Sequence, residues 1–220
     1  MPPARLRPTA PIAAAAILVG DPGRALMLAQ ELLQEPKMSN HARGLWGYTG
    51  TTEAGHELTI QSTGMGGPSA SVVLTDLAAL GVRRAVRIGT CTSLGDLALG
   101  EVIVVGDAQA GRGPLVSPEA TKATRPDPDL TQGLRDRLSG ARVARVRSLD
   151  SLYHPEGDIL STVADAVDMQ TAALLGTAED LGIPLAALLI VSERSDAGQL
   201  RDEDLETAAK TAGRAAAAVL

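Results

Sequence analysis

Short apolar runs alternate along the chain with segments of helical periodicity. Continuous runs rich in Val, Ile and Leu are typical of buried strands, whereas apolar residues spaced three and four apart predict helices. Strands are predicted at residues 14–19, 45–52, 56–63, 84–88, 102–105, 142–147 and 185–191. Helices are predicted at residues 24–33, 71–80, 130–138, 172–181 and 203–220. This alternation predicts an α/β fold: a single domain with a central mixed β-sheet flanked by helices.

Turn-forming residues mark several of the predicted boundaries. A Gly-Asp-Pro-Gly turn follows the first strand, and Pro22 suits the first turn of the helix after it. Asp202 is the expected N-cap of the last helix. The proline-rich segment 110–128 is expected to be a long surface excursion.

Composition and charge narrow the possible partners. The chain has 220 residues, enough for one domain with a proper core, and a net charge of −6. An acidic surface repels nucleic acid, so no nucleic-acid partner is expected. Cys91 is the only cysteine and the three histidines are scattered, so neither an intrachain disulfide nor a metal site is predicted. The run 14–19 is too short to cross a bilayer, so no membrane partner is expected and the protein is predicted to be cytoplasmic.

Five polar clusters stand at the ends of predicted strands or the starts of helices, where ligands of open α/β sheets bind. They are Gly-Asp-Pro-Gly-Arg at 20–24, Gly-Met-Gly-Gly-Pro-Ser at 64–69, Arg-Ile-Gly-Thr-Cys-Thr at 87–92, Val-Asp-Met-Gln at 167–170 and Ser-Glu-Arg-Ser-Asp at 192–196. Taken singly, each has a plain structural interpretation as a turn or a solvated loop. A helix start followed by Arg24 could equally bind an anion. The buried Arg87 requires an anionic partner, either a ligand or an internal carboxylate.

The order and spacing of these clusters resemble the nucleoside phosphorylase family that contains the hexameric purine nucleoside phosphorylases and the uridine phosphorylases. The resemblance runs from about Ile17 to the C-terminus. Gly-Asp-Pro-x-Arg, Gly-Met-Gly-x-Pro-Ser and Arg-x-Gly-Thr/Ser all match in order, and residues 41–50 resemble an Arg-containing hairpin of the family. Four motifs in the family's order are far more specific than any one alone.

The resemblance implies phosphorolysis of the N-glycosidic bond, giving free base and ribose 1-phosphate. Inorganic phosphate is then a co-substrate, and no other cofactor and no metal is implied. The implied phosphate ligands are Gly20, Arg24, Arg87, Thr90 and, donated by a neighbouring subunit, Arg43. Three guanidiniums and a hydroxyl would neutralise and orient a divalent anion. The donated arginine further implies a homo-oligomer, expected to be a hexamer built as a trimer of dimers.

The implied ribose contacts match the family less closely. They are Met65, Met169, Gln170 and Arg5, of which Arg5 stands where the family has a histidine that crosses to the neighbouring ribose. The family's Glu-Met-Glu falls on Asp168-Met169-Gln170. Gln170 could accept from ribose hydroxyls but without charge, so Gln170→Glu is predicted to raise kcat/KM on ribonucleosides.

The implied base contacts are Cys91, Thr92, Arg147, Asp168, Glu193 and Arg194. Glu193 could protonate N7 of a purine as a general acid, or accept from N1–H and the 2-amino group of guanine. Arg147 replaces a stacking aromatic, and Thr92 replaces a glycine. The residues with which uridine enzymes read the uracil edge are not recognisable near 153–158. Purine is therefore favoured, with uridine possible, and the catalytic candidates are Glu193, Arg24 and Arg87.

Two alternatives remain open. One is a diverged family member that binds phosphate or nucleoside with weak or no catalysis, which the changes at positions 92, 147 and 170 favour. The other is a nucleosidase of related fold, which uses water as nucleophile. A nucleosidase has no need of an arginine cage for phosphate, so the retained Arg24, Arg43 and Arg87 favour phosphorolysis.

Overall fold

A computed structural model describes residues 5–111, 123–150 and 164–220 of the chain. The predicted surface excursion at 110–128 lies largely outside these residues. The segment 153–158, searched for a uracil-binding pair, lies wholly outside them.

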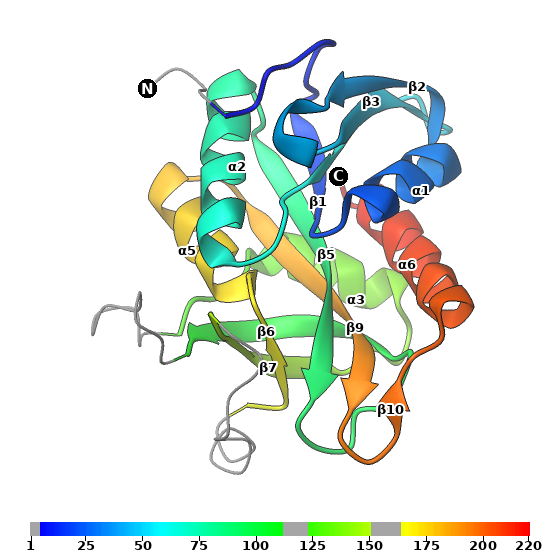
Figure 1. Ribbon diagram of the computed structural model, residues 1–220, viewed down its shortest axis with the longest axis vertical. Helices are drawn as coiled ribbons and strands as arrows, with labels where there is room; N and C mark the ends of the chain where they lie inside the picture. The colour runs from blue at the N-terminus through cyan, green and yellow to red at the C-terminus, as the bar shows by residue number, and fades with distance from the viewer. Residues whose placement is uncertain (1–4, 112–122, 151–163) are drawn as a thin grey trace.

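One sheet runs through the described part of the chain, in the order β10-β9-β6-β7-β8-β5-β1-β4-β3-β2 (Figure 1). Its strands are β1 (Ala15–Val19), β2 (Leu33–Asn40), β3 (Gly47–Thr52), β4 (Glu57–Ser62), β5 (Arg84–Ser93), β6 (Val102–Ala110), β7 (Val143–Ser148), β8 (Ala166–Asp168), β9 (Leu185–Arg194) and β10 (Gly198–Gln199). An additional pairing joins β9 to β5, so β5, β9, β6, β7 and β8 close into a ring. The sheet is mixed, as predicted.

Helices cover both faces of the sheet (Figure 1). They are α1 (Pro22–Leu32), α2 (Gly67–Leu80), α3 (Pro128–Arg137), α5 (Thr171–Leu181) and α6 (Asp202–Ala217), with a short 3-10 turn η1 (Ala42–Gly44). Side chains alternate between the faces along a strand. Along β1, Leu18 packs in the core under α2 and α5, whereas Ile17 and Val19 pack in the core under α1, α3 and α6. Both cores consist almost entirely of Ala, Leu, Val and Ile.

The predicted elements are all present, some longer than predicted (β5, β6, β9, α2) and some shorter (β1, β3, β4, α6), and three further strands are added. The segment that forms β2 carries a polar, exposed stretch at residues 34–38 and has no apolar periodicity, which is why the sequence did not predict it. β8 and β10 have only three and two residues. The predicted N-cap was wrong by one position. Arg201 has the extended cap conformation, and Asp202 is the first helical residue, where its charge favours the helix dipole.

Strands β1, β4, β5 and β9 run parallel to one another, so their carboxyl ends lie at one edge of the sheet. This edge gathers the polar clusters that follow or end those strands. None of the helices in the described residues is both long and apolar enough to cross a membrane.

Candidate functional site

A pocket of about 580 Å³ opens at this edge of the sheet. All five polar clusters contribute to its walls, from the turn after β1, the turn after β4, the end of β5, the segment from β8 into α5, and the end of β9. The lining includes the predicted site residues Gly20, Arg24, Met65, Arg87, Thr90, Cys91, Thr92, Asp168, Met169, Gln170 and Glu193. The sequence therefore identified most of one continuous cavity.

Arg24 brings to this pocket a guanidinium that has no hydrogen-bonded partner among the described residues. Asp21 caps α1 by accepting a hydrogen bond from the backbone N–H of Arg24 at 2.7 Å, which fixes the start of the helix. The guanidinium of Arg24 has no hydrogen bond or ion pair with any described residue. Burial lowers the pKa of this guanidinium, and the positive charge of the nearby Arg87 lowers the pKa further. The negative charge of Asp21 raises the pKa, but by less than burial lowers it. A desolvated, unpaired guanidinium favours the binding of an anion.

Arg87 lines the same pocket, but its guanidinium is also held from within. Its Nε donates to Thr171 Oγ1 at 3.0 Å, its Nη1 to Gln170 Oε1 at 2.7 Å, and its Nη2 to Asp168 Oδ2 at 2.9 Å. The residue is 3% exposed. Arg87 therefore pairs with an internal carboxylate, and two of its five N–H donors are not used by these bonds in a residue that lines the pocket.

Asp168 is turned toward the protein interior, although it was predicted to contact the base. Its Oδ1 accepts from Ser148 Oγ at 2.5 Å, and its Oδ2 from Thr171 Oγ1 at 2.6 Å and from Arg87. The backbone N–H of Thr171 also donates to it at 3.0 Å. These bonds occupy both carboxylate oxygens, so Asp168 orients Arg87. Sequence reasoning missed Ser148 and Thr171, because neither stands in a recognisable motif.

Glu193 and Thr92 form the other end of the pocket. The Thr92 hydroxyl donates to Glu193 Oε2 at 3.3 Å, and no described residue bonds to Glu193 Oε1. Cys91 lies beside them, and burial raises the pKa of its thiol, which keeps it neutral. Glu193 thus keeps one carboxylate oxygen available to a ligand.

Two further predicted base contacts lie outside the pocket lining. Arg147 projects from the opposite face of β7 to Ser148, and its Nη1 donates to Gln109 Oε1 at 3.3 Å. Arg194 is directed toward Asp196, with Nε–Oδ1 at 2.8 Å, and toward the carbonyl of Leu97. Their proposed contacts with the base remain predictions.

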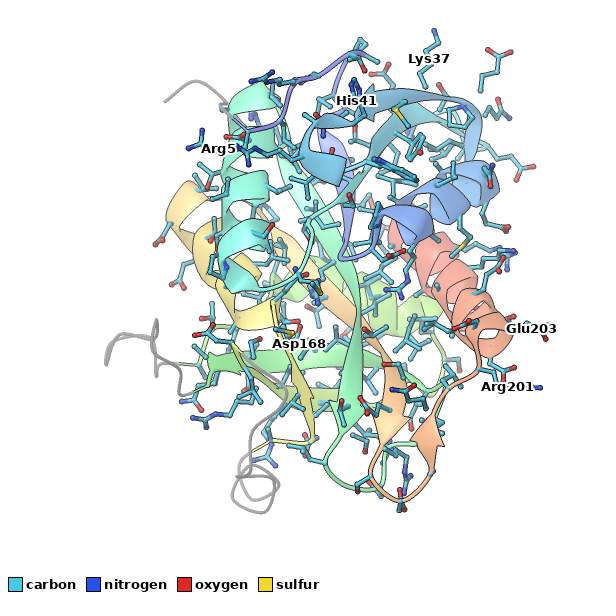
Figure 2. The ribbon with its side chains drawn as sticks, in the orientation of Figure 1. Arg5, Lys37, His41, Asp168, Arg201 and Glu203 are labelled. Atoms are coloured by element: carbon cyan, nitrogen blue, oxygen red, sulfur yellow. The ribbon has the colours of Figure 1, made fainter. Side chains whose placement is uncertain are left out.

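Arg5 and Arg43, predicted to serve a neighbouring subunit, lie together in a second hollow of about 400 Å³. Figure 2 shows Arg5 and His41 toward one end of the molecule and Asp168 nearer its middle. Arg43 has a positive φ of 60°, uncommon for a residue with a side chain, and its guanidinium is exposed. Arg7 also lines the hollow, and its backbone N–H donates to Asn40 Oδ1 at 2.8 Å. The hollow therefore presents three guanidiniums that are not part of the lining of the first pocket.

A metal centre is not formed by the part of the chain that the structure describes. No three of its His, Cys, Asp and Glu residues are grouped so that they could hold an ion.

Comparison with known proteins relates this chain to a family. A family model described as "Phosphorylase superfamily" matches residues 14–220. A DeoD-type purine nucleoside phosphorylase of Bacillus cereus (strain ZK / E33L) is 32% identical over 200 residues, covering 86% of this chain and 85% of that protein. The corresponding protein of Bacillus thuringiensis (strain Al Hakam) is 31% identical over the same length.

A solved structure is similar in fold. It is the purine nucleoside phosphorylase of Toxoplasma gondii in complex with immucillin-H, with a TM-score of 0.81 and 22% identity. The match covers 94% of this chain and 92% of that one. The predicted fold class is thus confirmed.

Proposed function

The chain belongs to the phosphorylase superfamily, and we propose that it catalyses phosphorolysis of purine nucleosides, giving free base and ribose 1-phosphate. The observation that carries this proposal is the unpaired, desolvated guanidinium of Arg24 in the same pocket as Arg87 and Thr90. Such a site favours a phosphate dianion, whereas hydrolysis by water needs no cation there.

We propose a role for each end of the pocket. Arg24, Arg87 and the Thr90 hydroxyl hold phosphate beneath the sugar, with the backbone at Gly20 alongside. Phosphate attacks the anomeric carbon as the bond to the base breaks, and the bound anion stabilises the positive charge that develops on the sugar. Glu193, at the opposite end, contacts the departing base and can supply a proton to it.

A purine is the base that we propose, and two observations support it. The curated relatives with the matching length are named purine nucleoside phosphorylases. Glu193 also offers a free carboxylate oxygen at the base end, suited to a ring N–H or a protonated ring nitrogen. Uridine is the less favoured substrate.

We also propose that the active form is a homo-oligomer, with a hexamer as the expected assembly. Among the described residues that line the pocket, two guanidiniums (Arg24, Arg87) face three carboxylates (Asp21, Asp168, Glu193), a formal charge of −1. A dianion needs further positive charge. The exposed hollow around Arg43 provides it if a neighbouring copy docks there.

The reaction is tested by incubating the protein with inosine, guanosine, uridine and thymidine, with and without inorganic phosphate, and following base release. Release of purine base that depends on phosphate is the expected result. Release without phosphate would indicate a nucleosidase, and phosphate binding without any release would indicate a non-catalytic family member.

The donation between subunits has its own test. Arg24→Ala and Arg43→Ala are each expected to lose most of their activity at low phosphate concentration, because each removes one phosphate ligand from every site. Mixed oligomers of the two variants should regain activity, since some sites then combine an intact Arg24 with an intact Arg43 from the neighbour. Mixtures that stay inactive, with a monomeric protein in light scattering, would refute the shared site.

A further inference from the structure

We propose that Gln170 is a positioning residue for phosphate: its amide holds Arg87 and the glycine-rich turn at Gly64–Gly66 in place, and it does not bind the ribose hydroxyls. The inference rests on the proposed function, because it assigns to phosphate a residue that the sequence assigned to the sugar. It concerns the hydrogen bonds made by one buried carboxamide.

The oxygen of the Gln170 amide is directed at Arg87. Oε1 accepts from Arg87 Nη1 at 2.7 Å, the shortest of the three bonds that hold this guanidinium. The Thr63 hydroxyl lies 3.2 Å from the same oxygen and 3.0 Å from the carbonyl of Val19, which immediately precedes the turn at Gly20. The hydroxyl has one proton to share between these two acceptors, so Arg87 is the main donor to the amide oxygen and Thr63 lies against it.

The nitrogen of the amide is directed at the turn after β4. Nε2 donates to the carbonyl of Gly64 at 2.6 Å and to that of Gly66 at 3.3 Å. A carboxamide has two N–H donors, and both are used here. Gln170 is only 3% exposed, so a ribose hydroxyl would have to displace one of these bonds to reach it.

The consequence is that one side chain joins three walls of the pocket. It links β5 through Arg87, the turn that carries Met65, and the start of α5, while Thr63 extends the link to the end of β1. A fixed guanidinium loses little conformational entropy when phosphate binds, which strengthens binding. Gln170 thus acts on phosphate through Arg87.

A glutamate could not do the same. A carboxylate has no donor for the two glycine carbonyls, and buried carbonyl oxygens facing a carboxylate are unfavourable. It would also place a second negative charge beside Asp168, with Arg87 between the two. We therefore expect Gln170→Glu to impair the enzyme, the opposite of what the sequence alone suggested.

The experiment compares Gln170→Glu and Gln170→Met with the wild type. Gln170→Met keeps the length of the side chain and removes every side-chain hydrogen bond of Gln170 without adding charge. It therefore tests the positioning role of Gln170 even if Gln170→Glu does not fold. Gln30→Glu is the matched control, since it makes the same chemical change at an exposed position of α1. Binding of inorganic phosphate is measured by titration calorimetry, and KM is measured separately for phosphate and for inosine.

Both variants are expected to raise the Kd and the KM of phosphate by about tenfold or more, as the loss of a charge-assisted hydrogen bond implies. The KM of inosine should change by less than about threefold, and the control should match the wild type. A raised inosine KM with an unchanged phosphate Kd would overturn the proposal, because it would place Gln170 on the sugar. If the wild type releases no base, the proposed function fails, while the phosphate Kd of the variants still decides this inference.

Discussion

Replacing Gly89 by alanine probes the packing of Arg87, the arginine proposed to bind phosphate, without removing a hydrogen-bonding side chain. Gly89 follows Arg87 by two positions in β5, and the guanidinium folds back over it. A Cβ built on Gly89 would lie 2.7 Å from Arg87 Cζ, closer still to Nη2, and 2.7 Å from Leu189 Cδ2. Atoms cannot approach so closely, and the guanidinium is fixed by its bond to Asp168. The glycine in the Arg-x-Gly-Thr motif is therefore required by the side chain two residues before it.

The magnitude follows from opposing effects. Alanine lowers the entropy of the unfolded chain, which stabilises by about 0.4–1 kcal/mol. Crowding in a packed interior costs about 1–3 kcal/mol, and the loosened bond to Asp168 adds about 1.5–3 kcal/mol. The net loss is about 1.5–5.5 kcal/mol, or a fall in Tm of about 3–22 °C for a chain of this length. A displaced guanidinium should also raise the phosphate KM about ten- to hundredfold.

Calorimetry gives Tm, and initial rates at varied phosphate give KM. Gly176→Ala is the control, because a Cβ there meets nothing within 4 Å. It lies inside α5, where alanine is favoured by about 1 kcal/mol, so its Tm should rise while its phosphate KM stays constant. A Gly89→Ala protein with the Tm and the phosphate KM of the wild type would refute this account of Arg87.

Three further outcomes are expected. Arg24→Met should raise the phosphate KM at least about tenfold without lowering Tm, since it removes an unpaired, desolvated charge; a lower Tm would indicate a structural partner. Burial raises the pKa of Cys91, so its thiol should not react with Ellman's reagent at pH 8 until the protein is unfolded. The hydrogen bond from Arg142 lowers the pKa of Glu101 in the folded protein. This interaction stabilises the fold at pH values above the pKa that Glu101 has in the unfolded chain. The stabilisation is lost as the pH falls through the pKa of Glu101 in the folded protein. Glu101→Gln should therefore cost about 1 kcal/mol or less at pH 7 in denaturant titrations, with no difference from the wild type near pH 3.

The sequence predicted the walls of the pocket because their signals are local. Each of these signals occupies fewer than ten consecutive residues. They are a turn at a strand end, a helix start with an arginine, and a glycine-rich segment. The parallel order of the strands then brings them to one edge. Arg24 and Arg87 could be assigned to one cavity from the motifs alone.

The partners of those residues could not be predicted in the same way. The bonds that hold Arg87 join residues 81 to 84 positions apart, and periodicity carries no information at that separation. The sequence left open whether Arg87 binds a ligand or pairs with an internal carboxylate. It also predicted that Gln170 contacts the ribose. Both questions depended on how β8 places Asp168 beside β5, and β8 is too short to leave a pattern.

The hydrogen bonds of the three carboxylates in the pocket determine which of them is left for the substrate. Asp21 uses Oδ1 to cap α1, next to the phosphate end. Asp168 is occupied on both oxygens by protein donors. Glu193 Oε1 and Asp21 Oδ2 accept no hydrogen bond from a described residue, and Glu193 stands where β9 pairs with Thr92 of β5, whereas Asp21 stands at the start of α1. We therefore expect Glu193, which Thr92 holds by a hydrogen bond, to be the carboxylate that contacts the base, while Asp21 stays at the start of α1.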